Sequence, residues 1–313
     1  MSSNYKLLNS RSRITKNLAK KYDFSFCGIA QARKLVEHEE AMQHYLDKHY
    51  HGNMHYMENY FEKRLDPSKL VPGTKTVISL LYNYYPEKYF DENSPFKISR
   101  YALGKDYHYI VKDKLKALTN EMLEQLGEFS YRYFVDTAPI LERAWARESG
   151  LGWIGKNTML INLKHGSYFF LAEILLDMEM AYDKPMQQDF CGSCHKCIDA
   201  CPTNALSPYK IDASRCISYL TIENRDDIIP EEFNNNYDQW VFGCDICQQV
   251  CPWNKFSIFH DEDEFEPHNE LFSLSEKQWK ELTKEQYQKI FRKSAVKRTK
   301  FKGLRRNIDF LSD

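Results

Sequence analysis

The alternation of apolar and polar stretches along residues 1–185 predicts a domain built from both helices and strands. Apolar residues at helical spacing indicate helices that end near Lys21, span residues 32–48, run from Asp106 to Leu126 and span residues 141–149. Strand-like apolar runs lie between and after them: FSFCGIA, VISLLYNYY, FKISRYAL, YRYFVDTAP, NTMLINL and SYFFLAEILLD. This mixture is typical of an α+β fold, in which helices cover the faces of a sheet.

The pattern changes after residue 185. Residues 186–256 hold eight of the nine cysteines and show little periodic apolar patterning, so bound ligands are expected to take the place of a hydrophobic core. Residues 257–313 begin with an acidic loop and continue as helices on either side of Thr283. We therefore predict a sheet-and-helix domain over 1–185, an inserted cysteine-rich domain over 186–256 and a short helical, basic segment over 257–313.

The length and the charge of the chain limit the class of protein and the kind of binding partner that can be expected. A chain of 313 residues is long enough for one large domain with an appendage, or for two ordinary domains, and so to enclose a cofactor. The net charge of -1 does not by itself predict a polyanionic partner. Between Arg292 and Arg306, however, eight basic residues occur without an acidic one. This basic strip is either a solvated helix face or a phosphate-binding surface.

No segment of the sequence has the pattern of a secretion signal or a membrane span. The N-terminal residues lack the apolar core of a secretory signal. The longest apolar stretch, Tyr168 to Leu176, is interrupted by Glu173 and falls short of the roughly 20 residues that a membrane helix needs. We therefore expect a soluble, cytoplasmic protein, in which clustered cysteines indicate metal ligation rather than disulfides.

Two cysteine runs dominate the middle of the chain. The first matches the bacterial ferredoxin spacing C-x2-C-x2-C-x3-C-P at every position, and the second repeats the latter half of that spacing. The first run consists of Cys191, Cys194, Cys197 and Cys201. The second consists of Cys244, Cys247 and Cys251, and Cys216 lies between the runs as an eighth thiol. Eight thiolates are what two 4Fe-4S clusters require, which leaves Cys27 as a small buried residue.

The spacing also predicts how the two clusters share their ligands. In two-cluster ferredoxins the last cysteine of each run binds the other cluster. We therefore predict one cluster held by Cys191, Cys194, Cys197 and Cys251, and a second held by Cys216, Cys244, Cys247 and Cys201. The alternative is a pair of structural zinc sites, but zinc sites usually draw on two separated C-x2-C pairs. Three cysteines at two-residue gaps followed by Cys-Pro favour iron-sulfur cubanes.

Three nucleotide- or corrin-binding motifs match in letters but not in context. Gly150, Gly152 and Gly155 satisfy G-x-G-x-x-G, yet they follow a predicted helix and precede a strand, the reverse of a dinucleotide site. The same stretch is nearly a P-loop, but Asn157 stands where the magnesium-binding Ser or Thr is needed. Residues 47–52 match D-x-H-x-x-G, but they close a helical stretch, which favours a solvated helix end.

Six segments together resemble the epoxyqueuosine reductase family. They are KRLDPSKLVPGTKTVISLLYNY, SRYALGKDYH, VDTAPILERAWARESGLGWIGKNTMLI, CGSCHKCIDACPTNAL, FGCDICQQVCPWN and SAVKRTKFKGLRRN. In this order the six segments span nearly the whole chain. The resemblance implies a cobalamin-dependent enzyme that performs the final step of queuosine biosynthesis, reducing the epoxide of epoxyqueuosine to an alkene at the wobble position of tRNA. It also implies that the first domain holds the cobalamin and that the nearer cluster feeds it electrons.

The resemblance gives further residues a role. Asp136 matches the catalytic acid of the family, whereas its sequence context alone would make it a turn or cap residue after a strand. We expect the apolar strand and the corrin to bury it, so that it arrives protonated. The residues in segments that line the corrin are Arg64, Lys156, Asn157, Gly243 and Asp245.

The resemblance also predicts the partners of the chain. The anticodon stem-loop of tRNA would be held by residues of the basic strip, namely Lys297, Arg298, Lys300, Arg305 and Arg306. A low-potential electron donor is required, and we expect a monomer. Two alternatives stay open on the sequence: a corrinoid iron-sulfur reductase that acts on a small molecule, and a ferredoxin-like subunit that only carries electrons.

Overall fold

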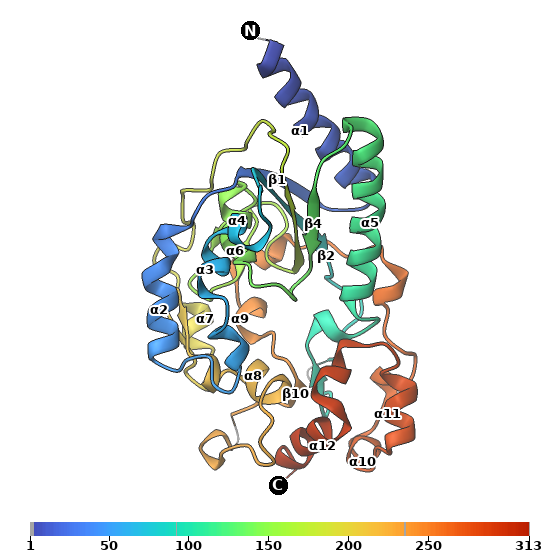
Figure 1. The fold of residues 1–313 in the computed structure, drawn as a ribbon. Helices are drawn as coiled ribbons and strands as arrows, with labels where there is room; N and C mark the ends of the chain where they lie inside the picture. The colour runs from blue at the N-terminus through green and yellow to red at the C-terminus, as the bar shows by residue number, and fades with distance from the viewer. Residues whose placement is uncertain (1–2, 92, 235, 313) are drawn as a thin grey trace.

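The centre of the molecule is a four-stranded antiparallel sheet with the strand order β1-β2-β7-β4. The computed structural model describes residues 3–91, 93–234 and 236–312 (Figure 1). The strands of the sheet are β1 (Phe26–Gln31), β2 (Thr76–Asn83), β4 (Tyr131–Phe134) and β7 (Phe169–Leu176). Each of them lies within an apolar run that the sequence identifies as strand-like, and the α+β prediction is confirmed.

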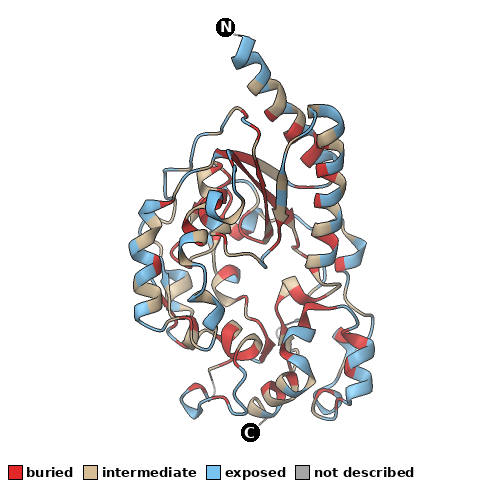
Figure 2. Ribbon diagram, in the orientation of Figure 1, coloured by how far each residue is buried: buried red, intermediate tan, exposed pale blue. Residues whose placement is uncertain are grey.

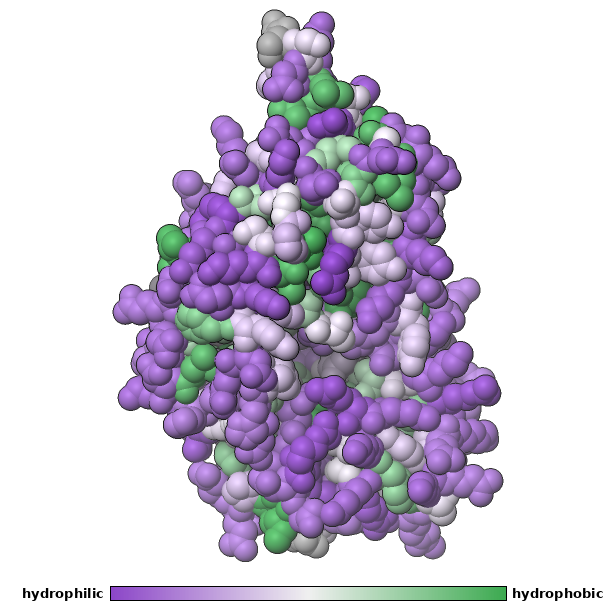
Figure 3. Space-filling view, in the orientation of Figure 1, coloured by the Kyte–Doolittle hydropathy of each residue, from purple (hydrophilic) through white to green (hydrophobic). Residues whose placement is uncertain are grey.

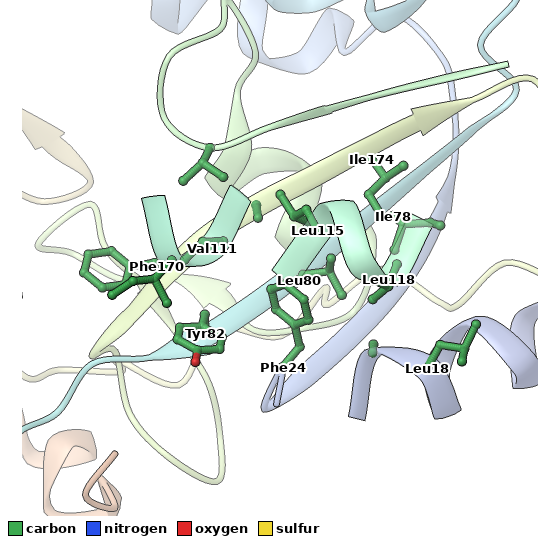
Figure 4. Packing of buried hydrophobic residues seen from close by; sticks show 14 of the residues in the cluster. Leu18, Phe24, Ile78, Leu80, Tyr82, Val111, Leu115, Leu118, Phe170 and Ile174 are labelled. Atoms are coloured by element: carbon green, nitrogen blue, oxygen red, sulfur yellow. The ribbon is translucent and has the colours of Figure 1, made fainter. Parts of the chain in front are cut away.

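One face of the sheet is covered by two long helices, α1 (Ser3–Lys21) and α5 (Tyr107–Leu126). Side chains alternate between the two faces of a strand, so every second residue of β2 and β7 points toward these helices. The residues in this core that Figure 4 labels are Leu18, Phe24, Ile78, Leu80, Tyr82, Val111, Leu115, Leu118, Phe170 and Ile174. Most of them are fully buried, and we call this cluster the main hydrophobic core of the fold.

The other face of the sheet packs against the short helix α6 (Glu142–Glu148). Trp145 of α6 is fully buried there against Val77 and Leu175. Figure 2 shows that burial concentrates on the strands and on the inward faces of the helices. The loop between β4 and α6 leaves the sheet at its edge, and this loop carries Asp136.

Shorter elements complete the chain. Before the second strand lie α2 (Glu39–Asp47), α3 (Phe61–Leu65) and α4 (Pro67–Leu70), and after α6 lie β5 (Trp153–Ile154) and β6 (Leu160–Ile161). The cysteine-rich region contains α7 (Lys196–Asp199), β8 (Leu206–Ser207), β9 (Lys210–Ile211), α8 (Ile217–Ile222), β10 (Trp240–Phe242) and α9 (Ile246–Gln249). The helix expected over 32–48 is shorter than predicted, because only residues 39–47 are α-helical after a 3-10 turn.

The C-terminal helices pack onto a segment from the first half of the chain. These helices are α10 (Glu276–Lys280), α11 (Lys284–Ile290) and α12 (Lys300–Phe310). Strand β3 (Lys97–Ile98) pairs in parallel with β10, and Phe96 packs on Trp279 of α10. Residues 96–103 therefore belong in space with the C-terminal core rather than with the sheet. Among the described helices, none is both long and apolar enough to cross a membrane.

Candidate functional site

Asp136 lies in a tight turn just after β4, on the side of the sheet where the chain enters α6. Its backbone φ is 57°, a left-handed conformation that few residues other than glycine adopt. The side chain is 62% exposed, so the expectation that the strand would bury it is wrong for the protein alone. The reason is that β4 ends at Phe134, which leaves Asp136 beyond the apolar part of the strand.

Two neighbouring side chains of α5 lie beside the Asp136 carboxylate. The Tyr107 hydroxyl donates to Oδ2 of Asp136 over 2.7 Å, and Nε2 of His108 lies 3.7 Å from the same oxygen. Nδ1 of His108 is within 2.7 Å of the Asp106 carboxylate, which fixes the ring. The Tyr107 ring stacks on Phe170 with 4.0 Å between centroids. Burial, and then the charge of Asp136, raise the pKa of Tyr107 well above its usual value, so this hydroxyl stays protonated and donates.

The wider surroundings of Asp136 come from three distant segments. Burial raises the pKa of Tyr101, and the charges of Asp136 and then Asp245 raise it further. The Tyr101 ring packs edge-on against Tyr107, with 6.2 Å between centroids. Tyr56 likewise has its pKa raised by burial, and it feels the charges of Arg298, Asp136 and Arg64. Figure 3 shows a largely polar surface that is hollowed between the sheet-bearing part and the C-terminal helices.

The structure gathers the seven cysteines of the two runs and Cys216 into two groups of four. The first group lines one small cavity of about 50 Å³ and consists of Cys191, Cys194, Cys197 and Cys251. In the second group, burial raises the thiol pKa values of Cys216, Cys244 and Cys247, and neighbouring thiols raise them further. The fourth member is Cys201, whose charge acts on Cys216 and Cys247. These are the groups that the ferredoxin crossing rule predicts, although the structure does not test which thiol binds iron.

The chemistry of the two groups fits iron-sulfur clusters. All nine cysteines lie within the described residues, and none forms a disulfide. Burial raises the pKa of Cys197, and the thiols of Cys251, Cys191 and Cys194 raise it further, because adjacent thiolate charges repel one another. Positively charged iron offsets that repulsion, so crowded buried thiols are suited to cubanes. The indole N–H of Trp153 also points at Sγ of Cys191 over 3.5 Å.

Lys156 and Asn157 contact the cysteine loops. The buried ammonium group of Lys156 donates to the carbonyls of Gly192 and Cys194, over 2.7 and 3.1 Å. The Asn157 amide donates to the carbonyl of Cys247 over 3.3 Å. These two side chains therefore join the two cysteine runs to the turn after α6, and any contact with a corrin stays a prediction.

The other three corrin candidates lie at different edges of the site. Arg64 is buried, where it donates to the carbonyls of Tyr56 and Asn59, and burial lowers its pKa. Asp245 is also buried and accepts from the backbone N–H of Arg100 over 2.8 Å. Gly243 has a φ of 69°, and a Cβ there would lie 2.5 Å from the Ser99 side chain, so glycine is required.

The basic strip divides into residues that the protein itself occupies and residues that face solvent. The Arg306 guanidinium donates to the carbonyls of Leu220, Asn224 and Asp226, over 2.8, 3.1 and 2.7 Å. Arg305 donates to the carbonyl of Lys280 and pairs with a carboxylate of its own helix.

The remaining three candidates of the strip are exposed. Arg298 forms a bidentate pair with Glu223 at 2.9 and 3.1 Å. Within the described residues, neither Lys297 nor Lys300 has an ion-pair partner.

Comparison with known proteins identifies the two halves of the site. A family model described as "Epoxyqueuosine reductase QueG, DUF1730" matches residues 64–137, which end just after Asp136. A model described as "4Fe-4S double cluster binding domain" matches residues 190–254. An epoxyqueuosine reductase of Leadbetterella byssophila is 52% identical over 302 residues, which cover 96% of this chain and 98% of that protein. The chain belongs to the epoxyqueuosine reductase family.

Solved structures of this family share the fold. A crystal structure of epoxyqueuosine reductase with an epoxyqueuosine-modified tRNA-Tyr stem loop superposes with a TM-score of 0.86 at 29% identity, covering 96% of this chain and 81% of that one. The Bacillus subtilis epoxyqueuosine reductase gives the same TM-score at 27% identity and the same coverage, and its catalytic aspartate loop is swung out of the active site.

Sequence reasoning missed several residues of the site. Tyr107 and His108 stand in the segment SRYALGKDYH, which supports the family resemblance, but no local signal shows that they meet an acid 29 and 28 residues later. Glu142 accepts the Asp136 backbone N–H over 2.7 Å and looks like an ordinary first-turn glutamate in the sequence. Only the tertiary fold reveals these partners.

Proposed function

We propose that this chain reduces the epoxide of epoxyqueuosine in tRNA to the alkene of queuosine and that Asp136 supplies a proton to the departing oxygen. The observation that carries the proposal is a carboxylate that accepts a hydrogen bond from Tyr107 and lies beside His108, in a protein that also presents two groups of four thiols. The overall reaction breaks both C–O bonds of the epoxide and forms a C=C bond. It consumes two electrons and two protons and releases the oxygen as water.

Each cofactor has a stated part in this reaction. The two 4Fe-4S clusters pass one electron at a time, and cobalamin, when bound, supplies the low-potential cobalt chemistry that acts on the epoxide. Asp245 lies between Cys244 and Cys247 in the sequence, and it accepts the backbone N–H of Arg100, the residue before Tyr101. The Tyr101 ring packs on Tyr107, whose hydroxyl donates to Asp136. This favours the second group of thiols as the cluster nearer to the substrate. Arg64, Lys156, Asn157, Gly243 and Asp245 are proposed to line the corrin.

The chain's own residues prepare the proton transfer. Tyr107 and His108 approach the same oxygen of Asp136, so the other oxygen stays available for a substrate. An alkoxide is a poor leaving group, and a positioned acid contributes about 10²–10⁴-fold to such a step. We propose that the Asp136 turn corresponds to the catalytic aspartate loop of the Bacillus subtilis relative.

The experiment that tests this role is Asp136→Asn in protein reconstituted without oxygen. The variant should keep its iron and its cobalamin spectrum but lose turnover of epoxyqueuosine tRNA by about 10²-fold or more, because the amide cannot give up a proton. Turnover is measured by separating queuosine from epoxyqueuosine nucleosides after digestion. Near-normal turnover would remove Asp136 from the proposed role.

The solvent-facing part of the basic strip is proposed to hold phosphates of the tRNA. Arg298 lies near Asp136, since its pKa is raised first by the hydrogen bond to Glu223 and further by the charges of Tyr56 and Asp136. Lys297 is an exposed neighbour in the same turn. Arg306 is unsuited to phosphate binding because backbone carbonyls occupy its donors.

Charge reversal separates these two kinds of basic residue. Lys297→Glu with Arg298→Glu should weaken tRNA binding and lower the salt dependence of the affinity by about one to two phosphate contacts, with iron content unchanged. Binding is measured by a filter or anisotropy assay across salt concentrations. Arg306→Ala is the matched comparison: it should reduce stability before affinity, since three carbonyls lose their donor. Unchanged affinity in the double variant would refute the assignment.

Several finer points belong to the same proposal. We propose a monomer in the cytoplasm, where tRNA is modified, served by a low-potential reductase or electron carrier. The division into 1–185, 186–256 and 257–313 is a functional one, comprising cofactor and substrate pocket, electron relay and basic segment. It is not a division into separate bodies, because residues 96–103 pack with the C-terminal helices.

A further inference from the structure

A carboxyl group without an obvious task lies in the middle of the sheet. Glu173 of β7 pairs in register with Ser79 of β2 and Phe134 of β4. Its neighbour two residues along, Leu175, packs with α6, so Glu173 points to the α6 face as well. The residue is 0% exposed. A glutamate in such a place is costly unless it is neutral or has a partner.

The acidic residue that faces Glu173 is Glu142, the first residue of α6, which packs on this face of the sheet. The charge of Glu142 raises the pKa of Glu173. Neither oxygen of Glu173 has a partner at ordinary hydrogen-bond geometry in the part of the chain that the structure describes. The other charged groups that face the pair are Asp136 and Arg143, and the guanidinium of Arg143 is directed to the carbonyl of Thr158 over 2.5 Å.

Two carboxyl groups that face each other, one fully buried at Glu173 and one half-buried at Glu142, cannot both be ionised. Burial raises the pKa of Glu142, and the charge of Asp136 raises it further. Burial also raises the pKa of Glu173 well above its usual value, with Glu142 as the next cause. The pair therefore carries at least one proton at neutral pH, and a shared proton fixes both side chains.

The fixed Glu142 side chain reaches the turn that carries the proposed acid. Its Oε1 accepts the backbone N–H of Asp136 over 2.7 Å. Asp136 has a left-handed φ, a strained conformation that persists only where the surroundings hold it. On the side-chain end, Tyr107 holds the carboxylate. The hydrogen bond that the Asp136 N–H donates to Glu142 restrains the backbone of the turn in the same way.

We propose that Glu142 and Glu173 form a proton-sharing pair that positions the Asp136 turn for reaction, with Glu142 as the positioning residue that grips the Asp136 amide. This inference rests on the proposed role of Asp136. The turn would be released when the pair is broken, and the acid would then no longer be aimed at the substrate.

The test compares two ways of changing Glu142. Glu142→Gln keeps an oxygen that accepts the Asp136 N–H, whereas Glu142→Ala removes it. In Glu142→Ala we expect faster hydrogen exchange in the peptide covering residues 135–141, and a kcat lowered by about 10- to 100-fold with KM for the tRNA little changed. Glu142→Gln should restore both quantities to near the parent values. Glu148→Gln, at the other end of α6, is the matched control.

The hydrogen-exchange measurement needs no cofactor and no substrate, so it stands even if Asp136 proves not to be the acid. If Glu142→Ala does not fold, Glu142→Asp replaces it, since the shorter side chain keeps the charge but cannot reach the amide. Unchanged exchange in the Ala or Asp variant, or a Gln variant as impaired as Ala, would overturn the proposal.

The shared proton can be tested separately, by the pH dependence of the thermal stability. The folded chain binds this proton more tightly than the unfolded chain, in which glutamate has a pKa of about 4.3, so stability falls as the pH rises above that value. Glu173→Gln removes this fall. The Tm of Glu173→Gln relative to the parent should therefore increase from about pH 6 to about pH 9. A difference that does not change with pH would show that the pair holds no proton.

Discussion

The sheet-bearing part and the cysteine-rich part of this molecule are stabilised differently. The sheet is sandwiched between α1 with α5 on one face and α6 on the other, and its central strands β2 and β7 are buried on both sides. The segment from Cys191 to Cys251 has only short helices and two-stranded pieces. It has a small core of its own between Ala213 and Trp240, so the expectation that ligands replace a core is wrong for that stretch. We expect the sheet with its helices, the scaffold, to hold its fold without a cofactor, and the loops that carry the two cysteine runs, the ligand-organised part, to depend on the ligands that they bind.

The comparison explains where function is placed. The acid Asp136 comes from the end of a scaffold strand, and its partners Tyr107 and His108 come from a scaffold helix. The electron carriers come from the ligand-organised part. The proposed reaction therefore requires that a positioned proton donor and the electron carriers be held in one fold.

The largest expected effect is the loss of a cluster ligand. Cys251→Ser should lose about half of the iron or more and should make residues 186–256 susceptible to protease, because a ligand-organised segment loses its order with its metal. Iron and sulfide analysis with limited proteolysis would show this. Cys27→Ser is the control and should keep full iron. Full iron in Cys251→Ser would contradict the proposed ligand set.

A smaller effect is expected in the scaffold. Leu80→Ala, at a fully buried position of β2, should lower the free energy of unfolding by about 2–5 kcal/mol because it leaves a cavity in the main core. Urea denaturation of protein reconstituted without oxygen measures the change. The folded variant should keep the iron content of the parent. A loss of iron at low denaturant would show that the two parts are not independent in this way.

The smallest effect concerns the ninth cysteine. Cys27 packs against the main core, and burial raises the pKa of its thiol to about 12. Only the thiolate reacts with iodoacetamide, so alkylation at pH 8 should be about 10³-fold slower than in the urea-unfolded chain and should rise with pH. Mass spectrometry of the Cys27 peptide gives the rate. Rapid alkylation of folded protein would place this thiol outside the core.

The sequence predicts the four strands of the sheet and the grouping of the cysteines by different local patterns. Apolar runs mark all four strands of the sheet, and the spacing of the cysteine runs predicts the groups of four that the structure brings together. Both are local patterns. The helix over 32–48 was predicted too long because a 3-10 turn at Val36–His38 precedes the α-helical part.

The site is less visible in the sequence, because its contacts are not local. Glu173 looks like a mere interruption of an apolar run, and its meeting with Glu142 depends on how α6 lies across the sheet. In the sequence the residues of the basic strip look alike. In the structure Arg306 donates to three backbone carbonyls that lie more than 75 residues away in the sequence, whereas Lys297 faces solvent. Charge composition cannot separate a structural arginine from a phosphate-binding lysine.

The position of the sheet in the chain sets an order of assembly. All four strands lie between Phe26 and Leu176, ahead of Cys191, the first residue of the cysteine runs. Because domains form progressively from the N-terminus during synthesis, the scaffold can close while the iron-binding thiols are still inside the ribosome. Binding of the iron-sulfur clusters is then the last step in the maturation of the molecule. A shortage of iron would leave a chain with a folded sheet and no clusters, rather than an unfolded chain.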